Sequence, residues 1–209
     1  MARKSMPKPI VIIDYGMGNL SSVSKAIKHL KADAVISHSP RVIQQADKVI
    51  LPGVGAFGDA MKELRARKLV NPILEHVQKH KKLLGICLGL QLLFESSEEN
   101  RGVKGLGILQ GKVRKFRTKK AKVPHMGWNQ LSAVADHPML NQISASDYFY
   151  FVHSYYAVPQ KECCYAESTH GGEKFTAIAG RGSVIAAQFH PEKSQDAGLA
   201  LLNHFIRWA

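Results

Sequence analysis

Cys87 stands between two glycines in the apolar run LLGICLGLQLLFE at 83–95. Most unpaired cysteines are small buried hydrophobes, but a core cysteine needs no glycine on either side. The stretch from Gly85 to Gly89 has the form G-x-nucleophile-x-G, which is typical of a nucleophile elbow between a strand and a helix. Glycines at these positions permit a tight, strained turn. The pattern therefore predicts a nucleophilic thiol, with a structural core cysteine as the alternative.

A thiol at such a turn faces the first backbone amides of the following helix. The partial positive charge of these amides favours the thiolate form of a cysteine. The same amides, beginning with that of Leu88, are also placed to bind the oxyanion that forms when a thiolate attacks a carbonyl group.

A thiolate needs a partner that transfers protons, and among the ten histidines His190 has the most suggestive context. The segment SVIAAQFHPEKS places it at the end of an apolar strand, with Glu192 two positions later. If this strand and the strand before Cys87 share a sheet, both side chains reach one crevice and Glu192 orients the imidazole. A capped strand end with solvated His and Glu side chains is the alternative. Four other histidines lie in helical patterns and are expected at partly exposed positions: His29, His76, His80 and His204.

The elements that position these residues follow a βαβαβ rhythm in the first half of the chain. Strand-like runs at 10–14 and 49–53 alternate with helical patterns, and a helical pattern over 57–80 leads into LLGIC. From about residue 105 hairpin-like segments with Gly, Pro and Asn take over, before a closing helix at 194–208. We expect an α/β fold with a central, mostly parallel sheet flanked by helices and an antiparallel, hairpin-rich second half. Sites in such sheets form at the carboxyl ends of strands, where Cys87 falls.

Length and composition suit one large globular domain, because the chain has 209 residues and 45% hydrophobic content. We expect an N-terminal extension at 1–9 and a single domain at 10–209. No apolar stretch reaches the length of a membrane span, and the basic start runs into a strand-like segment without a signal-peptide core. The three cysteines do not resemble a disulfide framework. These features favour a cytoplasmic protein.

The formal net charge of +13 raises nucleic acid, an anionic substrate or an acidic partner as candidate ligands. The densest basic segment, GKVRKFRTKKAK at 111–122, is interrupted by Val113 and Phe116. We favour an exposed hairpin with one apolar face over a nucleic-acid strip, because aromatic residues are sparse there. The adjacent Cys163 and Cys164 would point to opposite faces of a strand, which suits packing better than joint metal binding.

The pairing of GICLG with QFHPE closely resembles the motifs of class I glutamine amidotransferases. Four further stretches narrow the resemblance to the glutaminase subunits of imidazole glycerol phosphate synthases: DYGMGNLSSV at 14–23, LPGVGAFGDAM at 51–61, PHMGWN at 124–129 and FVHSYY at 151–156. The resemblance runs from about Ile10 to the C-terminus. It implies the class I amidotransferase fold, in agreement with the α/β pattern.

The resemblance implies a chemistry for individual residues. Cys87 attacks the side-chain amide of glutamine, and His190, held by Glu192, moves the proton that lets ammonia leave. Water then hydrolyses the glutamyl thioester to glutamate. The implied oxyanion donors are Leu88, Gly53 and Val54. The implied substrate-binding residues are Gln91, Ser154, Tyr155 and Glu95.

The resemblance also implies a partner, a cyclase subunit with a TIM-barrel fold. The two chains would form a heterodimer in which the cyclase receives the ammonia and forms imidazole glycerol phosphate in histidine biosynthesis. No cofactor, metal, nucleic acid or membrane is expected for this function. The implied interface residues are Asn19, Met126, Trp128 and Lys193.

The glycines at 53, 55 and 58 predict a loop with more than one backbone conformation. The Val54 amide could then turn toward an oxyanion or away from it, and a docked partner could select the active state. The alternative is that these glycines merely form a tight strand-to-helix turn.

Three other functions stay open. A related cysteine hydrolase could use the same elbow, although Leu88 stands where such enzymes often place a histidine. A glutaminase that serves another amidating synthase is closer to the pattern. A basic nucleic-acid-binding module is the third.

Overall fold

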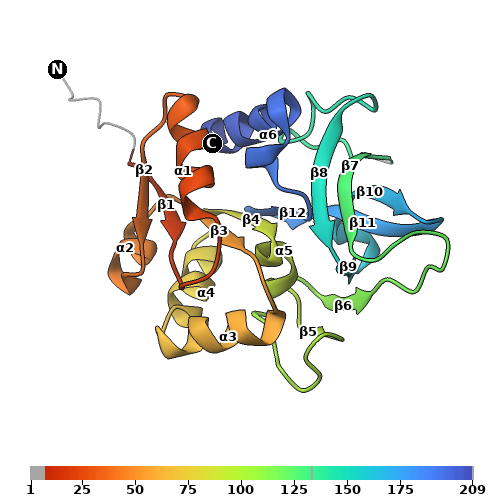
Figure 1. The fold of residues 1–209 in the computed structure, drawn as a ribbon. Helices are drawn as coiled ribbons and strands as arrows, with labels where there is room; N and C mark the ends of the chain where they lie inside the picture. The colour runs from red at the N-terminus through yellow and green to blue at the C-terminus, as the bar shows by residue number, and fades with distance from the viewer. Residues whose placement is uncertain (1–7, 133, 209) are drawn as a thin grey trace.

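The central feature of the fold is a seven-stranded sheet, formed within residues 8–132 and 134–208, the part of the chain that the computed structural model describes (Figure 1). Its strand order is β10-β11-β12-β4-β3-β1-β2. Strands β12, β4, β3, β1 and β2 are parallel to one another. Strand β11 pairs antiparallel with both β12 and β10. The bounds are β1 Ile10–Ile13, β2 Ala34–Ser37, β3 Lys48–Gly53, β4 Lys82–Cys87, β10 Cys164–His170, β11 Glu173–Arg181 and β12 Val184–Ala187. Residues 1–7 of the predicted N-terminal extension lie outside the described residues.

Helices cover both faces of this sheet. Successive side chains of a strand point to opposite faces, and because the central strands are largely apolar, both faces must be buried. Ile12 and Ile50 pack with helices α1 (Leu20–His29) and α6 (Gln195–Arg207) on one face. Val11 and Leu51 pack on the other face with helices α2 (Pro40–Gln45), α3 (Phe57–Ala66) and α4 (Val70–Gln78). In Figure 1 the first pair lies above the sheet, and α3 and α4 lie below it. No helix in the described part of the chain combines the length and apolar character that a bilayer crossing requires.

Two smaller sheets form most of the second half. Strands β5 (Ser96–Ser97), β6 (Gly111–Lys115) and β9 (Tyr155–Pro159) make one, and β7 (His125–Gln130) pairs antiparallel with β8 (Tyr148–His153) in the other. The basic segment at 111–122 contributes β6, whose antiparallel partner is the distant β9. The prediction of a local hairpin was therefore wrong, because this pairing joins strands far apart in the sequence. The apolar face is confirmed, since Val113 and Phe116 are buried beside exposed basic residues.

The helical pattern at 57–80 forms two helices where the sequence predicted a continuous helical segment. The chain turns between Ala66 and Val70, where Lys68 adopts the left-handed conformation with φ 57°. His76 on α4 is fully buried, and its Nε2 lies 3.1 Å from the Lys82 carbonyl oxygen. The prediction of a partly exposed histidine was therefore wrong at this position, because α4 turns it toward β4.

Cys163 and Cys164 do not occupy neighbouring strand positions. Cys163 is buried at the end of a short 3-10 helix, η1 (Lys161–Cys163), and Cys164 begins β10. Their predicted placement on opposite faces of one strand was therefore wrong.

Candidate active site

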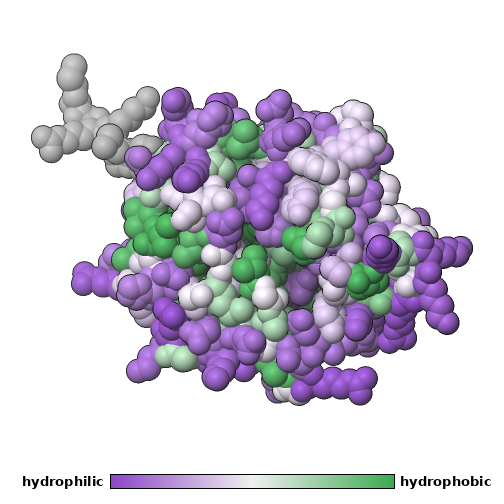
Figure 2. Space-filling view, viewed as in Figure 1, coloured by the Kyte–Doolittle hydropathy of each residue, from purple (hydrophilic) through white to green (hydrophobic). Residues whose placement is uncertain are grey.

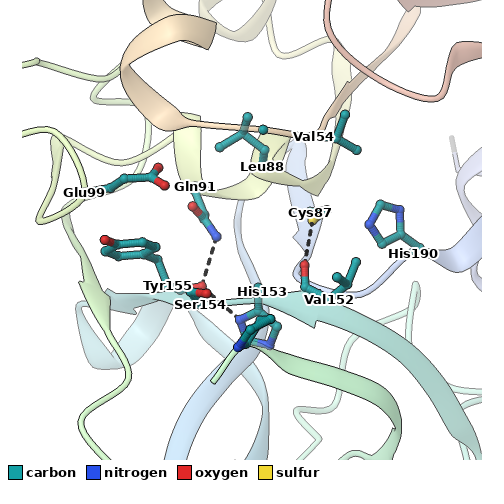
Figure 3. A pocket seen from close by; sticks show the side chains of 12 residues that line it. Val54, Cys87, Leu88, Gln91, Glu99, Val152, His153, Ser154, Tyr155 and His190 are labelled. Carbon is teal, nitrogen blue, oxygen red and sulfur yellow. Dashed lines mark hydrogen bonds between the residues drawn. The ribbon is translucent and has the colours of Figure 1, made fainter. Parts of the chain in front are cut away.

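A pocket of about 310 Å³ opens beside the carboxyl ends of β3 and β4, with the end of β8 and the start of β9 across from them (Figure 3). Its lining combines a thiol, an imidazole, an amide and a carboxylate, which come from Cys87, His190, Gln91 and Glu99. Figure 2 shows hydrophobic side chains near the centre of one face of the molecule, within a largely hydrophilic surface. The pocket thus gathers groups that the chain carries far apart in sequence.

Cys87 is the last residue of β4, and the short helix α5 (Leu88–Leu92) begins directly after it. The backbone at Cys87 has φ 54° and ψ −110°, a conformation that costs a non-glycine residue of order 1–3 kcal/mol. The elbow is therefore strained at the cysteine itself. Such strain is frequent where a side chain must be held for function.

Gly85 and Gly89 are needed for close packing rather than for an unusual φ. A Cβ atom at Gly85 would lie 2.9 Å from Cβ of Ala186, and one at Gly89 would overlap the carbonyl oxygen of Leu51. Both glycines thus let α5 approach the neighbouring strands. Close packing therefore explains the two glycines of the motif, whereas the sequence had suggested that they permit a tight turn.

Gly89→Ala is expected to destabilise the fold by about 1–3 kcal/mol or more, because the added methyl group must displace backbone atoms of β3. Denaturant unfolding would measure this loss. Gly107→Ala is the matched control, since nothing lies within 4 Å of its added Cβ and only its φ of 64° opposes the change. An equal effect of both substitutions would contradict the packing role of Gly89.

His190 and Glu192 form a buried pair at the end of β12. The Nδ1 atom of His190 lies 2.9 Å from Oε1 of Glu192, and both side chains are almost completely inaccessible to solvent. Glu192 lies in a 3-10 helix, η2 (Pro191–Lys193), and the His190 amide donates to the Tyr150 carbonyl at 2.9 Å. The Nε2 atom of His190 has no hydrogen-bond partner among the described residues, and its ring faces Cys87 in Figure 3.

The surroundings of His190 favour its protonated form. Burial lowers the pKa of an imidazole, but here the neighbouring Cys87 and Glu192 outweigh burial and raise the pKa of His190 to about 10. A protonated imidazole beside a sulfur atom can stabilise a thiolate and donate a proton to a leaving group. This arrangement is suited to nucleophilic attack by sulfur on a carbonyl carbon.

The predicted oxyanion and substrate residues lie around this centre with two exceptions. Leu88, Val54, Gln91, Ser154 and Tyr155 all line the pocket. Gly53 pairs in register with Cys87 at the end of β3 but is buried behind the lining. Glu95 lies outside the pocket, where it is exposed and accepts a hydrogen bond from the Gly111 amide at 3.0 Å.

Glu99 occupies the place in the pocket that the sequence suggested for Glu95. Its Oε2 atom accepts a hydrogen bond from the Phe57 amide at 2.7 Å, which holds the carboxylate at the edge of the pocket. Within ESSEEN the sequence offers no signal that separates Glu99 from its acidic neighbours. His153 was also missed, although it ends strand β8 as His190 follows β12.

The four predicted interface residues are all exposed on the described structure. Met126 and Trp128 are 64% and 46% exposed, and Asn19 and Lys193 are also at the surface. The ring of Tyr150 lies 5.9 Å from the Trp128 ring, and Nζ of Lys193 lies 5.9 Å from the same Tyr150 ring. Asn19 caps α1, which packs against η2. These residues remain predictions for the interface.

Among residues 8–132 and 134–208, no group of three or more His, Cys, Asp or Glu side chains is placed to hold a metal ion.

Comparison with known proteins gives a family match over almost the whole chain. A family model described as glutamine amidotransferase class-I matches residues 11–208. The chain is 50% identical to the imidazole glycerol phosphate synthase subunit HisH of Aquifex aeolicus, over 95% of this chain and 96% of the relative. The corresponding values for the HisH subunit of Syntrophotalea carbinolica are 48%, 94% and 98%. Those for the subunit of Bacillus subtilis are 46%, 96% and 96%.

Solved structures agree on the fold at much lower identity. A crystal structure of a glutamine amidotransferase superposes with a TM-score of 0.74 at 20% identity, over 94% of this chain and 97% of the other. The structure of PurLQS from Thermotoga maritima gives a TM-score of 0.75 at 17% identity, over 97% and 99%. The predicted α/β fold of the class I amidotransferase type is therefore confirmed.

Proposed function

Because the chain belongs to the class-I glutamine amidotransferases, we propose that it is the glutaminase subunit of an imidazole glycerol phosphate synthase. It would hydrolyse glutamine to glutamate and pass the ammonia to a second subunit for histidine biosynthesis. The observation that carries the chemistry is that the His190 ring, paired with the buried Glu192 side chain, faces Cys87 in one pocket.

Cys87, His190 and Glu192 are proposed as the catalytic triad. The Cys87 sulfur attacks the side-chain carbonyl carbon of glutamine, and His190 donates a proton to the nitrogen as the C–N bond breaks and ammonia leaves. A glutamyl thioester remains on the cysteine. His190 then removes a proton from water, which attacks the thioester and releases glutamate and the thiol. Glu192 holds the imidazole orientation through Nδ1.

The backbone amides of Leu88 and Val54 are proposed as oxyanion donors. Leu88 follows the nucleophile directly, and Val54 follows Gly53, which pairs in register with Cys87. Gly53 is a constrained part of this loop, since a Cβ there would overlap the Tyr15 hydroxyl. Val54 is 41% exposed and Gly55 has φ 93°, so conformational freedom lies at the Val54–Gly55 link.

The two charged ends of glutamine match the polar lining of the pocket. The Gln91 side-chain oxygen and the Glu99 carboxylate are proposed to bind its α-ammonium group, because both are hydrogen-bond acceptors. Ser154 and Tyr155, which also line the pocket, are proposed to bind the α-carboxylate.

The partner is proposed to be a cyclase subunit with a TIM-barrel fold, joined to this chain as a heterodimer. Asn19, Met126, Trp128 and Lys193 would contact it, since an exposed aromatic ring and a lysine beside the catalytic elements suit an interface anchor. A glutaminase that serves another synthase is the alternative function. The identities of 46–50% to HisH subunits favour the first proposal over this alternative.

Glutamate release measured with and without the cyclase subunit of the same organism tests this function. We expect the isolated chain to be slower by about 10²–10³-fold, the cost of one misplaced oxyanion donor. Docking of the cyclase with its nucleotide ligand would restore the rate by favouring the active orientation of the Val54 amide. Equal turnover under all conditions would refute the gating, and no turnover with the cyclase present would refute the assigned function.

A further inference from the structure

Two histidines that the proposed mechanism does not use lie side by side behind the pocket. Nδ1 of His125 on β7 is 3.0 Å from Nε2 of His153 on β8, and both rings are at least 94% buried. Phe151 and Phe175 enclose them, with Phe151 stacked on His125 at 4.9 Å. His153 also lines the pocket, so this pair connects the interior of the second half to the substrate site.

The hydrogen bonds at the outer end of the pair determine where its protons lie. The Asn129 side-chain nitrogen donates to the Thr169 carbonyl at 2.9 Å, which identifies that atom as the NH₂ group. The same nitrogen lies 3.3 Å from Nε2 of His125, so Nε2 must accept. A neutral His125 therefore carries its proton on Nδ1 and donates it to His153.

The hydrogen bond at the inner end of the pair requires the same direction of donation, from His125 to His153. His153 accepts at Nε2 and carries its proton on Nδ1, which lies 2.9 Å from the carbonyl oxygen of Tyr155. A carbonyl oxygen can only accept, so this end agrees with the outer end. The series Asn129–His125–His153–Tyr155, which we call the imidazole relay, is consistent with one placement of protons.

The imidazole relay requires both rings to be neutral. A proton on Nε2 of His125 would face the Asn129 NH₂ group, and a proton on Nε2 of His153 would face the donating Nδ1 of His125. Burial, together with the nearby His170, lowers the pKa of His125 to about 4. Burial likewise lowers the pKa of His153 to about 3. The two rings therefore stay uncharged at neutral pH.

The Tyr155 carbonyl links the relay to Gln91, because the oxygen that His153 Nδ1–H holds in place also accepts from the Gln91 side chain. The Gln91 side-chain nitrogen donates to Tyr155 O at 3.0 Å and to Oε1 of the buried Gln188 at 3.1 Å. Both of its protons are thereby used. The Gln91 oxygen has no hydrogen-bond partner in residues 8–132 and 134–208, and it points away from Tyr155 toward the Glu99 side of the pocket (Figure 3).

We propose that His125 and His153 are positioning residues that set substrate specificity through the imidazole relay. The relay holds the Tyr155 carbonyl where it accepts from the Gln91 NH₂ group, and this keeps the Gln91 oxygen toward the pocket. An amide held in this orientation accepts from an α-ammonium group, whereas a flipped amide would repel it with its own NH₂ group. The relay therefore favours free amino acids over amides that lack the α-ammonium group. The inference rests on the proposed glutaminase function and adds two residues that do not carry out the chemical steps.

The kinetic test compares L-glutamine with glutaramate, which keeps the reacting amide and the distal carboxylate but lacks the α-ammonium group. His125→Phe keeps an aromatic ring beside Phe151 and Phe175 but removes the donor to His153. With the cyclase present, we expect kcat/KM for L-glutamine to fall about 10- to 100-fold, mainly through KM, as for a lost hydrogen bond to a charged group. We expect kcat/KM for glutaramate to change by less than about threefold.

Two further variants separate the relay from packing. His125→Asn restores a side-chain donor near the position of Nδ1 and is expected to recover much of the preference for L-glutamine. His170→Phe is the matched control, because His170 stacks on His125 at 4.2 Å but lies outside the relay. Equal losses for both substrates in His125→Phe, or the same loss of preference in His170→Phe, would overturn the proposal.

A spectroscopic measurement tests the relay independently of activity. Nitrogen-15 NMR of the unmodified chain should show neutral Nδ1–H tautomers at His125 and His153 between about pH 6 and 8. In His125→Phe the tautomer preference of His153 should weaken. Nε2–H tautomers in the unmodified chain would refute the relay even if the chain is a glutaminase. The predicted tautomers without any glutamine turnover would instead refute the proposed function.

Discussion

Cys87→Ser is expected to lower glutamine hydrolysis by about 10⁴-fold or more, the scale seen when a catalytic nucleophile is removed. A serine hydroxyl is a far weaker nucleophile than a thiolate. In addition, Cys87 and Glu192 raise the pKa of His190, and a protonated imidazole cannot deprotonate an alcohol. Steady-state glutamate release with the proposed cyclase partner present would measure the loss.

The exchange should leave the fold intact, because the oxygen fits the space of the sulfur. Thermal unfolding and cyclase binding of Cys87→Ser should therefore match those of the unmodified chain. Cys164→Ser is a matched control. Cys164, on β10, is half-buried beside Thr176 and does not line the pocket. Full turnover by a folded Cys87→Ser protein would end the triad proposal.

His190→Ala is expected to lower glutamine turnover by a similar factor of about 10⁴, because both proton transfers depend on this imidazole. Glu192→Gln should leave measurable turnover. An amide oxygen in place of Oε1 can still accept from Nδ1 of His190, so the ring orientation survives while the negative charge is lost. The same turnover assay, run on all three proteins, would rank them.

The same pair predicts a change in the pH profile. Loss of the Glu192 charge removes one of the influences that raise the pKa of His190 above its ordinary value. The protonated imidazole of Glu192→Gln should therefore be lost at lower pH than in the unmodified chain, which a pH series of kcat/KM would detect. Turnover lower in Glu192→Gln than in His190→Ala would contradict an orienting role for the carboxylate.

Local patterns in the sequence determined the central part of this protein. Apolar runs at 10–14 and 49–53 and the run before Cys87 became parallel strands, because β-branched and apolar residues buried on both faces have few alternatives. The sequence placed Cys87 and His190 at strand ends, and the pairing of β12 with β4 in one sheet then brought them together, because the ends of parallel strands meet at one edge. The QFHPE spacing likewise implied the contact of His190 with Glu192, two residues apart.

Tertiary structure alone decided the features that depend on distant pairing. β6 joins β9, and this brings the chain after Tyr155 beside the basic segment, while Glu99 rather than Glu95 reaches the pocket through its contact with Phe57. The imidazole relay depends on the register of β7 against β8, which sets His125 opposite His153. Shifting a strand by one residue sends each side chain to the other face, so such contacts follow from register and not from the residue types. The two glycines of GICLG are a further example. Gly89 is needed because α5 packs against β3, and Gly85 because β4 packs against β12 and α5, and no local pattern contains these contacts.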